Sequence, residues 1–148
     1  MDTNRPAQLN GIVLVGVEVT SAEFKVKRRP EKEAKGFIKY SLSLRHEFTT
    51  KKEQPAPHAL VIHADAALQA WSGEAPEDGK EPADGDELMT CRVQVAVRYR
   101  MEKPEVTEAD MKKHLWHFQP QVALVAREYI RCLLKETPFA AIPIPTEA

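Results

Sequence analysis

Histidines are the residues of this sequence whose type and spacing come closest to a chemical site. His114 and His117 are three residues apart, and Asp110 lies one helical turn earlier, so one helical face could present all three to a metal ion. No pair of cysteines and no His-Glu-x-x-His motif accompanies them. We therefore interpret these histidines as incidental surface residues and expect no metal site.

The other three histidines do not indicate catalysis either. His46, His58 and His63 lie in or beside expected strands, and no Ser, Cys or carboxylate accompanies them in the pattern of a nucleophile with its base. We expect neither an enzyme nor a cofactor.

Clustered basic residues raise the separate hypothesis of a nucleic-acid interface. Arg92, Arg98 and Arg100 share one face of an expected strand, and a second basic cluster spans residues 25–29. A sheet that binds single strands interleaves aromatic side chains with its arginines, whereas Tyr99 points to the opposite face. The net charge is only -1. We favour a solvated face without nucleic acid, on which these arginines pair with Glu47 and Asp65.

Composition bounds the class of protein. The 148 residues are 43% hydrophobic and 29% charged, as expected for one globular domain spanning 1–148. Cys91 and Cys132 are the only cysteines, and both lie in apolar patterns typical of reduced thiols. The first ten residues have no apolar signal region, and no run is long enough for a membrane span. We expect a cytoplasmic protein without membrane insertion.

The elements that would position any site begin with four segments of strand-like alternation. They span residues 10–27, 38–48, 58–71 and 89–101. In the first, Val13, Val15, Val17 and Val19 are expected on one side; the alanines of the third would also suit a helix. Because the loops are too short for crossover helices, the strands are expected to pair antiparallel, with one apolar and one solvated face.

Between the third and fourth segments, residues 72–87 consist mainly of Gly, Pro, Asp and Glu. Such a segment buries too little apolar area to order itself, so we expect a mobile acidic loop that could serve as a partner's docking element.

The last third of the chain is expected to be helical. Thr107, with Glu108 and Asp110 after it, predicts an N-cap, and Pro120 is expected to interrupt or restart the helix. From residue 121 to 136 only a narrow stripe is polar, so the helix has more apolar surface than one small sheet can cover. A second copy of the chain would supply the missing cover. The expected oligomer interface comprises Val122, Val125, Tyr129 and Leu133.

The helix leads into an apolar, proline-rich segment at residues 137–145. Chain ends are usually polar and frayed, whereas this one carries Phe139, Ile142 and Ile144 between prolines. The pattern predicts that the segment docks on a surface elsewhere in the fold.

Together, the order of these elements and two sequence stretches resemble the SecB-type export chaperones. The stretches are ALVAREYI at residues 123–130 and TPFAAIPIP at residues 137–145. Thr107, Glu108 and Asp110, before an aromatic-bearing segment, are similar to the SecB-like chaperones encoded beside toxin–antitoxin pairs. The resemblance implies an α+β fold in which a long C-terminal helix packs on a four-stranded antiparallel sheet, and assembly into a dimer or tetramer.

The resemblance also implies apolar grooves for unfolded protein, formed between the sheet face, the linker into the helix and the helix itself. The residues expected to line them are Phe24, Val26, Tyr40, Leu42, Phe48, Trp71, Trp116 and Phe118. Tyr40, Leu42 and Leu44 are better explained as core beneath the helix, whereas Trp71 and Trp116 border a loop or a proline break, where recognition surfaces often lie.

The function implied by this resemblance is an ATP-independent holdase for unfolded or nascent polypeptides, for export or for a dedicated client. The alternatives are a module that binds one specific protein, such as an antitoxin or a phage factor, and, third, a nucleic-acid-binding module. Proteobacterial SecB extends beyond the proline-rich segment to contact SecA, whereas this sequence ends at Ala148. Of the two candidate partners, SecA and an antitoxin, SecA therefore fits less well, and we expect a stand-alone holdase or one that serves a particular client such as an antitoxin.

Overall fold

A computed structural model describes residues 12–30, 35–50, 57–77, 80–82, 84–101, 112, 113 and 115–145. In chain order the elements are β1 (Ile12–Val26), β2 (Gly36–Thr50), β3 (Pro57–Ser72), a 3-10 turn (Asp84–Asp86), β4 (Glu87–Met101) and α2 (Leu115–Leu134). All three strand pairs are antiparallel, in the order β1-β4-β3-β2. The predicted α+β class, with its four-stranded antiparallel sheet and C-terminal helix, is confirmed.

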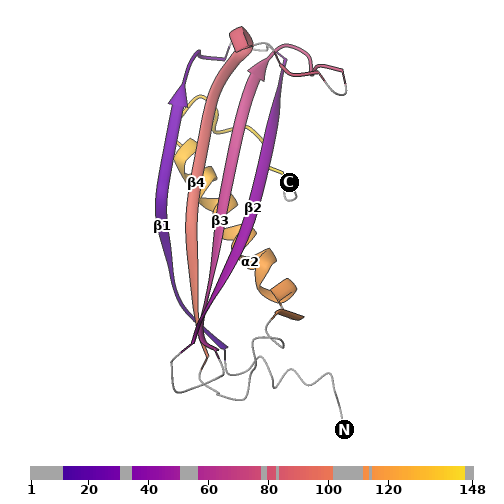
Figure 1. Ribbon diagram of the computed structural model, residues 1–148. Coiled ribbons are helices and arrows are strands. Elements are labelled where there is room, and N and C mark those ends of the chain that lie inside the picture. The colour runs from indigo at the N-terminus through magenta and orange to yellow at the C-terminus, as the bar shows by residue number, and fades with distance from the viewer. Residues whose placement is uncertain are drawn as a thin grey trace.

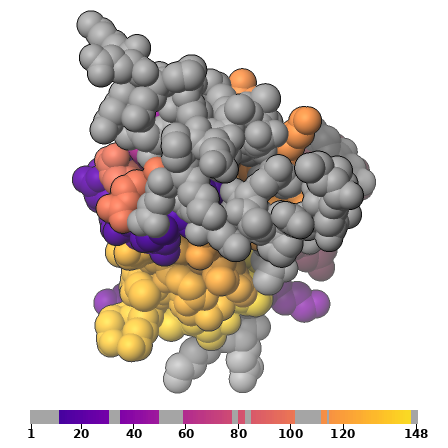
Figure 2. All heavy atoms as spheres, turned by 90° about the horizontal axis from the view of Figure 1, so that it is seen from below, coloured from indigo at the N-terminus to yellow at the C-terminus, as the bar shows by residue number. Residues whose placement is uncertain are grey.

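The helix covers one face of the sheet. Figure 1 shows α2 crossing diagonally behind the four strands, from the lower end of the sheet toward the upper end, where the C-terminal segment begins. In Figure 2, the orange and yellow atoms of α2 and that segment gather on one side of the molecule, beside indigo atoms of β1. We call this face of the sheet the helix side and the opposite face the open face.

The helix side is apolar because the alternation of three neighbouring strands coincides across the ladder. Tyr40, Leu68 and Cys91 lie opposite one another in one row, as do Phe48, Leu60 and Tyr99 in another. Directly paired residues share a face, so one-in, one-out patterns in three strands build a single apolar layer. Ala64, Ala66 and Ala70 of β3 are part of this layer and are buried, which resolves the strand-or-helix ambiguity in favour of a strand.

In β1 the simple alternation breaks down. The register shifts between Leu14 and Gly16 and again between Val19 and Ser21. Val13 therefore pairs with Arg100 on the open face, whereas Val17 pairs with Val97 on the helix side. The expectation that the four valines share one side is wrong, because each bulge adds an unpaired residue and reverses the facing of the residues beyond it.

The core side of α2 repeats every fourth residue. Val122, Ala126, Ile130 and Leu134 are buried on the sheet, mainly over β3 and β4. Pro120 lies inside the continuous helix, so the expected interruption or restart does not occur. A proline removes one backbone hydrogen bond but does not by itself end a helix whose apolar side is packed. The expected N-cap at Thr107, with Glu108 and Asp110, lies outside the described residues.

The C-terminal segment folds back on the helix side. Phe139 and Ile144 are buried, and Ile142 is half-buried. The Thr137 hydroxyl donates to the Leu134 carbonyl at 2.7 Å and accepts from the Phe139 amide at 3.1 Å, which shapes the turn after the helix. Further along, Arg127 Nε donates to the Ile144 carbonyl at 3.1 Å. The docking surface expected from the sequence is thus α2 and the adjacent sheet.

The connection between β3 and β4 is shorter than the acidic segment 72–87. Ser72 still belongs to β3, and Glu87 begins β4. Gly73 has a φ of 93°, a conformation that glycine adopts without steric cost, and it turns the chain away from β3. Glu87 is buried and accepts a hydrogen bond from Lys27 Nζ at 2.7 Å, so its assignment to a solvated loop is wrong.

Candidate functional site

A cavity of about 500 Å³ lies at the upper end of the molecule, between the β1–β2 connection, the adjoining ends of β2 and β3, and the C-terminal segment. We call it the end pocket. Its apolar lining comes from residues far apart in the sequence. These include Phe37, Ile38, Ala70, Trp71, Leu88, Phe139 and Ile142. Three basic residues also line it: Arg28, Arg29 and Lys35.

One close backbone approach shapes the wall of the end pocket. A Cβ atom added at Gly36 would lie 2.7 Å from the Trp71 carbonyl oxygen, so this position accepts only glycine without a local shift. With Gly36 in place, β2 pairs with β3 to its first residue, and the rings of Phe37 and Trp71 stack with centroids 5.2 Å apart. Phe139, on the opposite wall, meets Phe24 edge-on at 6.4 Å.

The eight predicted client-binding residues do not gather at one place. Trp71 lines the end pocket, and Phe24 contacts its wall through Phe139. Trp116 and Phe118 lie at the start of α2, toward the lower end of the sheet (Figure 1). On the helix side, Val26 ends β1 near the end pocket, and Tyr40, Leu42 and Phe48 follow one another along β2.

These eight side chains also differ in exposure. Trp71 is only 7% exposed, so it forms a wall and not the exposed recognition surface expected from its position near a loop. Trp116 is 62% exposed and stacks on His117. Val26 is 46% exposed. The other five are half-buried against the core: Phe24, Tyr40, Leu42, Phe48 and Phe118.

The two tyrosines on the helix side, Tyr99 and Tyr40, differ in whether their hydroxyl groups have a hydrogen-bond partner. Tyr99 donates its hydroxyl proton to Gln121 Oε1 at 2.7 Å and thereby links β4 to α2. The Tyr40 hydroxyl is buried without a hydrogen-bond partner among the described residues. Burial raises the pKa of both phenols, and Arg127 opposes the shift at Tyr40. An unsatisfied buried hydroxyl costs free energy, so Tyr40 stabilises the fold less than Tyr99 does.

Sequence reasoning missed part of the end pocket. Phe37 is out of phase with the alternating set of β2, and nothing in the sequence shows that it lies opposite Trp71. Arg28 and Arg29 stand out in the sequence only as members of a basic cluster. Their position at the pocket depends on the C-terminal segment folding back to the β1–β2 connection, a contact between residues more than a hundred positions apart.

A second apolar surface lies along β1. Leu14, Val17, Val19 and Val26 all pair with buried helix-side residues of β4, yet their exposed fractions are 47%, 38%, 38% and 46%. We call these four residues the β1 surface. They are exposed because α2 lies over β3 and β4 and not over this edge strand. A long apolar edge is normally covered or paired in a stable protein.

The predicted oligomer residues fall into two groups. Val122 is fully buried on the sheet of its own chain, so it has no surface for a partner, and its assignment to an interface is wrong. Val122 belongs to the set of every fourth residue through which α2 packs on the sheet, so it is a core residue. Val125, Tyr129 and Leu133 are half-buried beside it. Leu124, which the prediction omitted, is 53% exposed on the outer side of α2.

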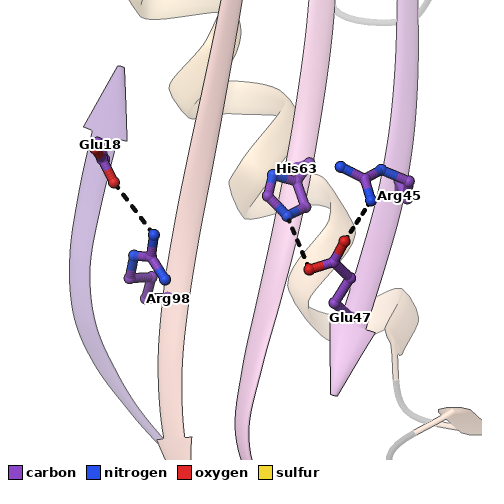
Figure 3. Close-up of polar contacts among 5 residues, drawn as sticks. All are labelled: Glu18, Arg45, Glu47, His63 and Arg98. Carbon is purple, nitrogen blue, oxygen red and sulfur yellow. Dashed lines mark hydrogen bonds and ion pairs between the residues drawn. The ribbon is translucent and has the colours of Figure 1, made fainter. Parts of the chain in front are cut away.

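The open face is polar, and its charges pair both within and across strands. Figure 3 shows Arg98 of β4 reaching Glu18 of β1 at 3.2 Å, while Glu47 accepts from Arg45 of its own strand and lies 3.6 Å from His63 Nε2. That last separation is too long for a hydrogen bond.

Asp65 and Glu47 are carboxylates of the open face whose pKa values are lowered by neighbouring arginines. Arg92 forms a bidentate ion pair with Asp65, which also accepts from Gln94 at 3.1 Å. The hydrogen bond from Arg92 holds the pKa of Asp65 below its usual value. The hydrogen bond from Arg45 does the same for the pKa of Glu47.

This pairing bears on the nucleic-acid hypothesis. Arg92 pairs with Asp65 as expected, whereas Arg98 pairs with Glu18 and Glu47 pairs within β2. Tyr99 faces the helix side, away from these arginines. The open face therefore lacks, among its described residues, the stacking platforms between arginines that a surface for single-stranded nucleic acid would require.

The histidines of the described residues have other neighbours. His117 stacks on Trp116, and the His46 and Phe48 rings meet at 5.4 Å. Within the described ranges, no group of three or more His, Cys, Asp or Glu side chains could hold a metal ion. Asp110 and His114 lie outside those ranges, as does the side chain of His58. No helix of the described segments is long and apolar enough to cross a membrane.

Among solved structures, this chain is similar to a SecB-like chaperone of Mycobacterium tuberculosis, Rv1957, in complex with a ChAD peptide from the Rv1956 HigA1 antitoxin. The match covers 94% of this chain and 93% of that chain, with a TM-score of 0.59 and 12% sequence identity. This chain has a SecB-like fold. The resemblance predicted from residues 123–130 and 137–145 is thus confirmed at the level of the fold.

No protein-family model and no curated protein matches the sequence. The SecB-like fold is therefore recognised through the coverage of the structural match, which extends over the sheet and the helix together. At 12% identity, the likeness shows the fold of the chain and assigns no role to any individual residue.

Proposed function

We propose that this chain is a client-binding chaperone: an ATP-independent holdase that binds unfolded or nascent polypeptide on its apolar surfaces. The observation that carries the proposal is the end pocket, a cavity of about 500 Å³ whose walls include Phe37, Trp71 and Phe139. Concave apolar sites of this size accept bulky side chains of an extended segment. The SecB-like neighbour holds a peptide of another protein, which supports the same class of partner.

The energetics suit transient holding. Covering a few hundred Å² of apolar client surface stabilises a complex by several kcal/mol at about 25 cal/mol per Å², before the cost of ordering the client. The apolar surfaces along the helix side, from Val26 to Trp116, would add weak contacts in series. The proposal involves no catalytic residue and no cofactor, because binding alone keeps aggregation-prone segments apart.

Assembly of two or more copies is part of the proposal. The β1 surface supplies exposed apolar side chains at a sheet edge of 15 residues, and Leu124 adds apolar area on α2. A second copy would cover both. Val125, Tyr129 and Leu133 remain proposed interface residues, whereas Val122 does not.

The assembly is tested by light scattering coupled to size exclusion. Val17→Asp should reduce the mass of the assembly, because it places a charge within the β1 surface. Val13→Asp is the matched control: the same substitution on the same strand, on the open face, where Val13 pairs with Arg100. A monomeric parent chain at micromolar concentration would contradict the assembly, as would equal masses for both variants and the parent.

The holdase function is tested by suppression of aggregation without ATP. Several unrelated proteins are unfolded by heat or dilution from denaturant, and their light scattering is measured with the chain at near-stoichiometric amounts. A holdase should keep most of them in solution, whereas an equal concentration of an unrelated folded protein should not. Failure to protect any client would refute the proposal.

A second candidate function is a dedicated partner of one protein. The SecB-like neighbour is bound to an antitoxin peptide, which favours this alternative. The same assay separates the two functions, because a dedicated partner protects one client and leaves the others to aggregate. An antitoxin or phage factor whose gene lies near the gene of this protein is the client to include.

A further inference from the structure

The charged side chains that the structure places in the lining of the end pocket are all basic. Arg28, Arg29 and Lys35 line it, and the described lining residues include no Asp or Glu. Arg28 is already engaged: its Nη2 donates to Ser72 Oγ at 3.2 Å and lies 3.8 Å from Asp86 Oδ1. Arg29 and Lys35 are exposed, and no carboxylate of the described residues pairs with either.

Arginines on the open face have a different environment. Arg45, Arg92 and Arg98 each form an ion pair with a carboxylate of the same sheet. At the end pocket, by contrast, two cationic side chains border an apolar cavity without such a partner among the described residues. Cations beside an apolar cavity favour a ligand that brings both apolar side chains and negative charge.

We propose that the end pocket selects client segments in which aromatic or aliphatic residues are flanked by Asp or Glu. This inference rests on the proposed client-binding function and specifies its ligand class. The apolar side chains would fill the space between Trp71, Leu88 and Phe139, while the flanking carboxylates would lie near Arg29 and Lys35. A segment flanked by Lys or Arg would instead meet the like charges of Arg29 and Lys35 at the same place.

Nucleic acid is a poorer occupant of this pocket. Its phosphates would pair with the cations, but the aliphatic part of the wall, formed by Ile38, Leu88 and Ile142, would stay uncovered. Most of the gain from filling such a pocket comes from apolar contact. A short single-stranded oligonucleotide is therefore included as a competitor that should not displace a bound acidic peptide.

The direct test uses three labelled peptides that share one core of Phe and Leu and differ only in their flanks, which are Glu, Gln or Lys. Binding is measured by fluorescence anisotropy. At low salt the Glu-flanked peptide should bind about tenfold more tightly than the Lys-flanked one, with the Gln-flanked peptide between them. The preference should fall as salt is added, because exposed charges are screened.

Charge reversal at the pocket supplies the matched variants. The double variant Arg29→Glu, Lys35→Glu should invert the order, so that the Lys-flanked peptide binds best. Lys39→Glu makes the same kind of change on β2, but at an exposed position that pairs with Gln69 and lies outside the pocket lining. It should keep the parent's preference. Equal affinities for all three peptides, or an unchanged order in the double variant, would overturn the inference.

The position of the bound peptide has its own readout. The chain has two tryptophans, and in a Trp116→Phe background only Trp71 emits. The emission of Trp71 should change on addition of the Glu-flanked peptide. Binding that leaves this emission unchanged would place the peptide elsewhere and refute the pocket assignment.

The outcomes also separate the two proposals. If no peptide binds and no client is protected from aggregation, both the chaperone function and this inference fail. If all peptides bind regardless of their flanks, only the charge selectivity fails. A second copy of the chain is one further possible occupant of the pocket, and light scattering during the titration tests for it. If the peptide halves the mass of the assembly, a second copy fills the pocket, and the inference is overturned.

Discussion

The two faces of the sheet satisfy their side chains in different ways. On the helix side, residues such as Val95 and Ile62 are buried beneath α2 and contribute through apolar area. On the open face, Asp65 and Arg92 or Glu18 and Arg98 pair across strands while staying partly in water. Burial without charge stabilises strongly, whereas exposed ion pairs contribute little. The stability of the fold should therefore depend on one face, and its solubility on the other.

The largest effect is expected beneath the helix. Ile130→Ala removes a fully buried side chain between α2 and the sheet and should lower the free energy of unfolding by about 3 kcal/mol. Denaturant unfolding monitored by circular dichroism measures it, at several chain concentrations because assembly adds to stability. Arg131→Ala, at the adjacent exposed position, is the control and should change stability little. Equal effects for the two would contradict the conclusion that burial between α2 and the sheet dominates stability.

A smaller loss is expected at the start of β2. Gly36→Ala would place a Cβ 2.7 Å from the Trp71 carbonyl oxygen, which forces a shift that should cost about 2 kcal/mol. It should also weaken peptide binding at the end pocket, because Phe37 and Trp71 move with the strands. Gly16→Ala is a suitable comparison, since a Cβ there meets nothing within 4 Å. Normal stability and binding in Gly36→Ala would show that the close approach is not needed.

On the open face, the expected effects depend on pH. The pKa of Asp65 is lowered by Arg92, so the folded chain holds its proton less tightly than the unfolded chain. The ion pair thus contributes stability above the unfolded pKa of about 4, and this contribution disappears as pH falls through the folded pKa. Asp65→Asn should cost about 1 kcal/mol at neutral pH and flatten the acid side of the stability curve. Parallel curves for parent and variant would show that the pair contributes nothing.

The smallest effect is expected at the edge of the open face. The Arg98–Glu18 pair is exposed on both sides, so its coupling in a double-mutant cycle should be about 0.5 kcal/mol and should disappear in high salt. A coupling comparable to the loss in Ile130→Ala would reverse the ranking of the two faces.

Much of the architecture was predictable because local chemistry determined it. Strict alternation in β2 and β4 marks strands whose two faces differ, and the structure confirms both. The alternation in β1 is misleading, because a bulge has no reliable mark in a single sequence and reverses the facing of every residue beyond it. Pro120 is misleading in the same way: packing of the helix on the sheet outweighs a local breaker.

The candidate site was less predictable than the fold. Trp71 is identifiable from the sequence, but its stacking partner Phe37 and the nearby Arg29 and Lys35 depend on strand register and on where the C-terminal segment returns. The Val122 prediction was wrong for a related reason. A helix apolar over most of its girth does not reveal which stripe its own sheet covers, and Val122 lies in that stripe.

By itself, the sequence determined the element types, the antiparallel sheet and the apolar nature of the final segment. These depend on residue periodicity, on connections too short for crossover helices and on local composition. Tertiary structure alone decided which apolar residues stay exposed, because that depends on how far one helix reaches across four strands. The helix covers β3 and β4 and leaves Leu14 and Val17 of β1 uncovered. The same long-range packing brings residues from distant parts of the chain together around the end pocket.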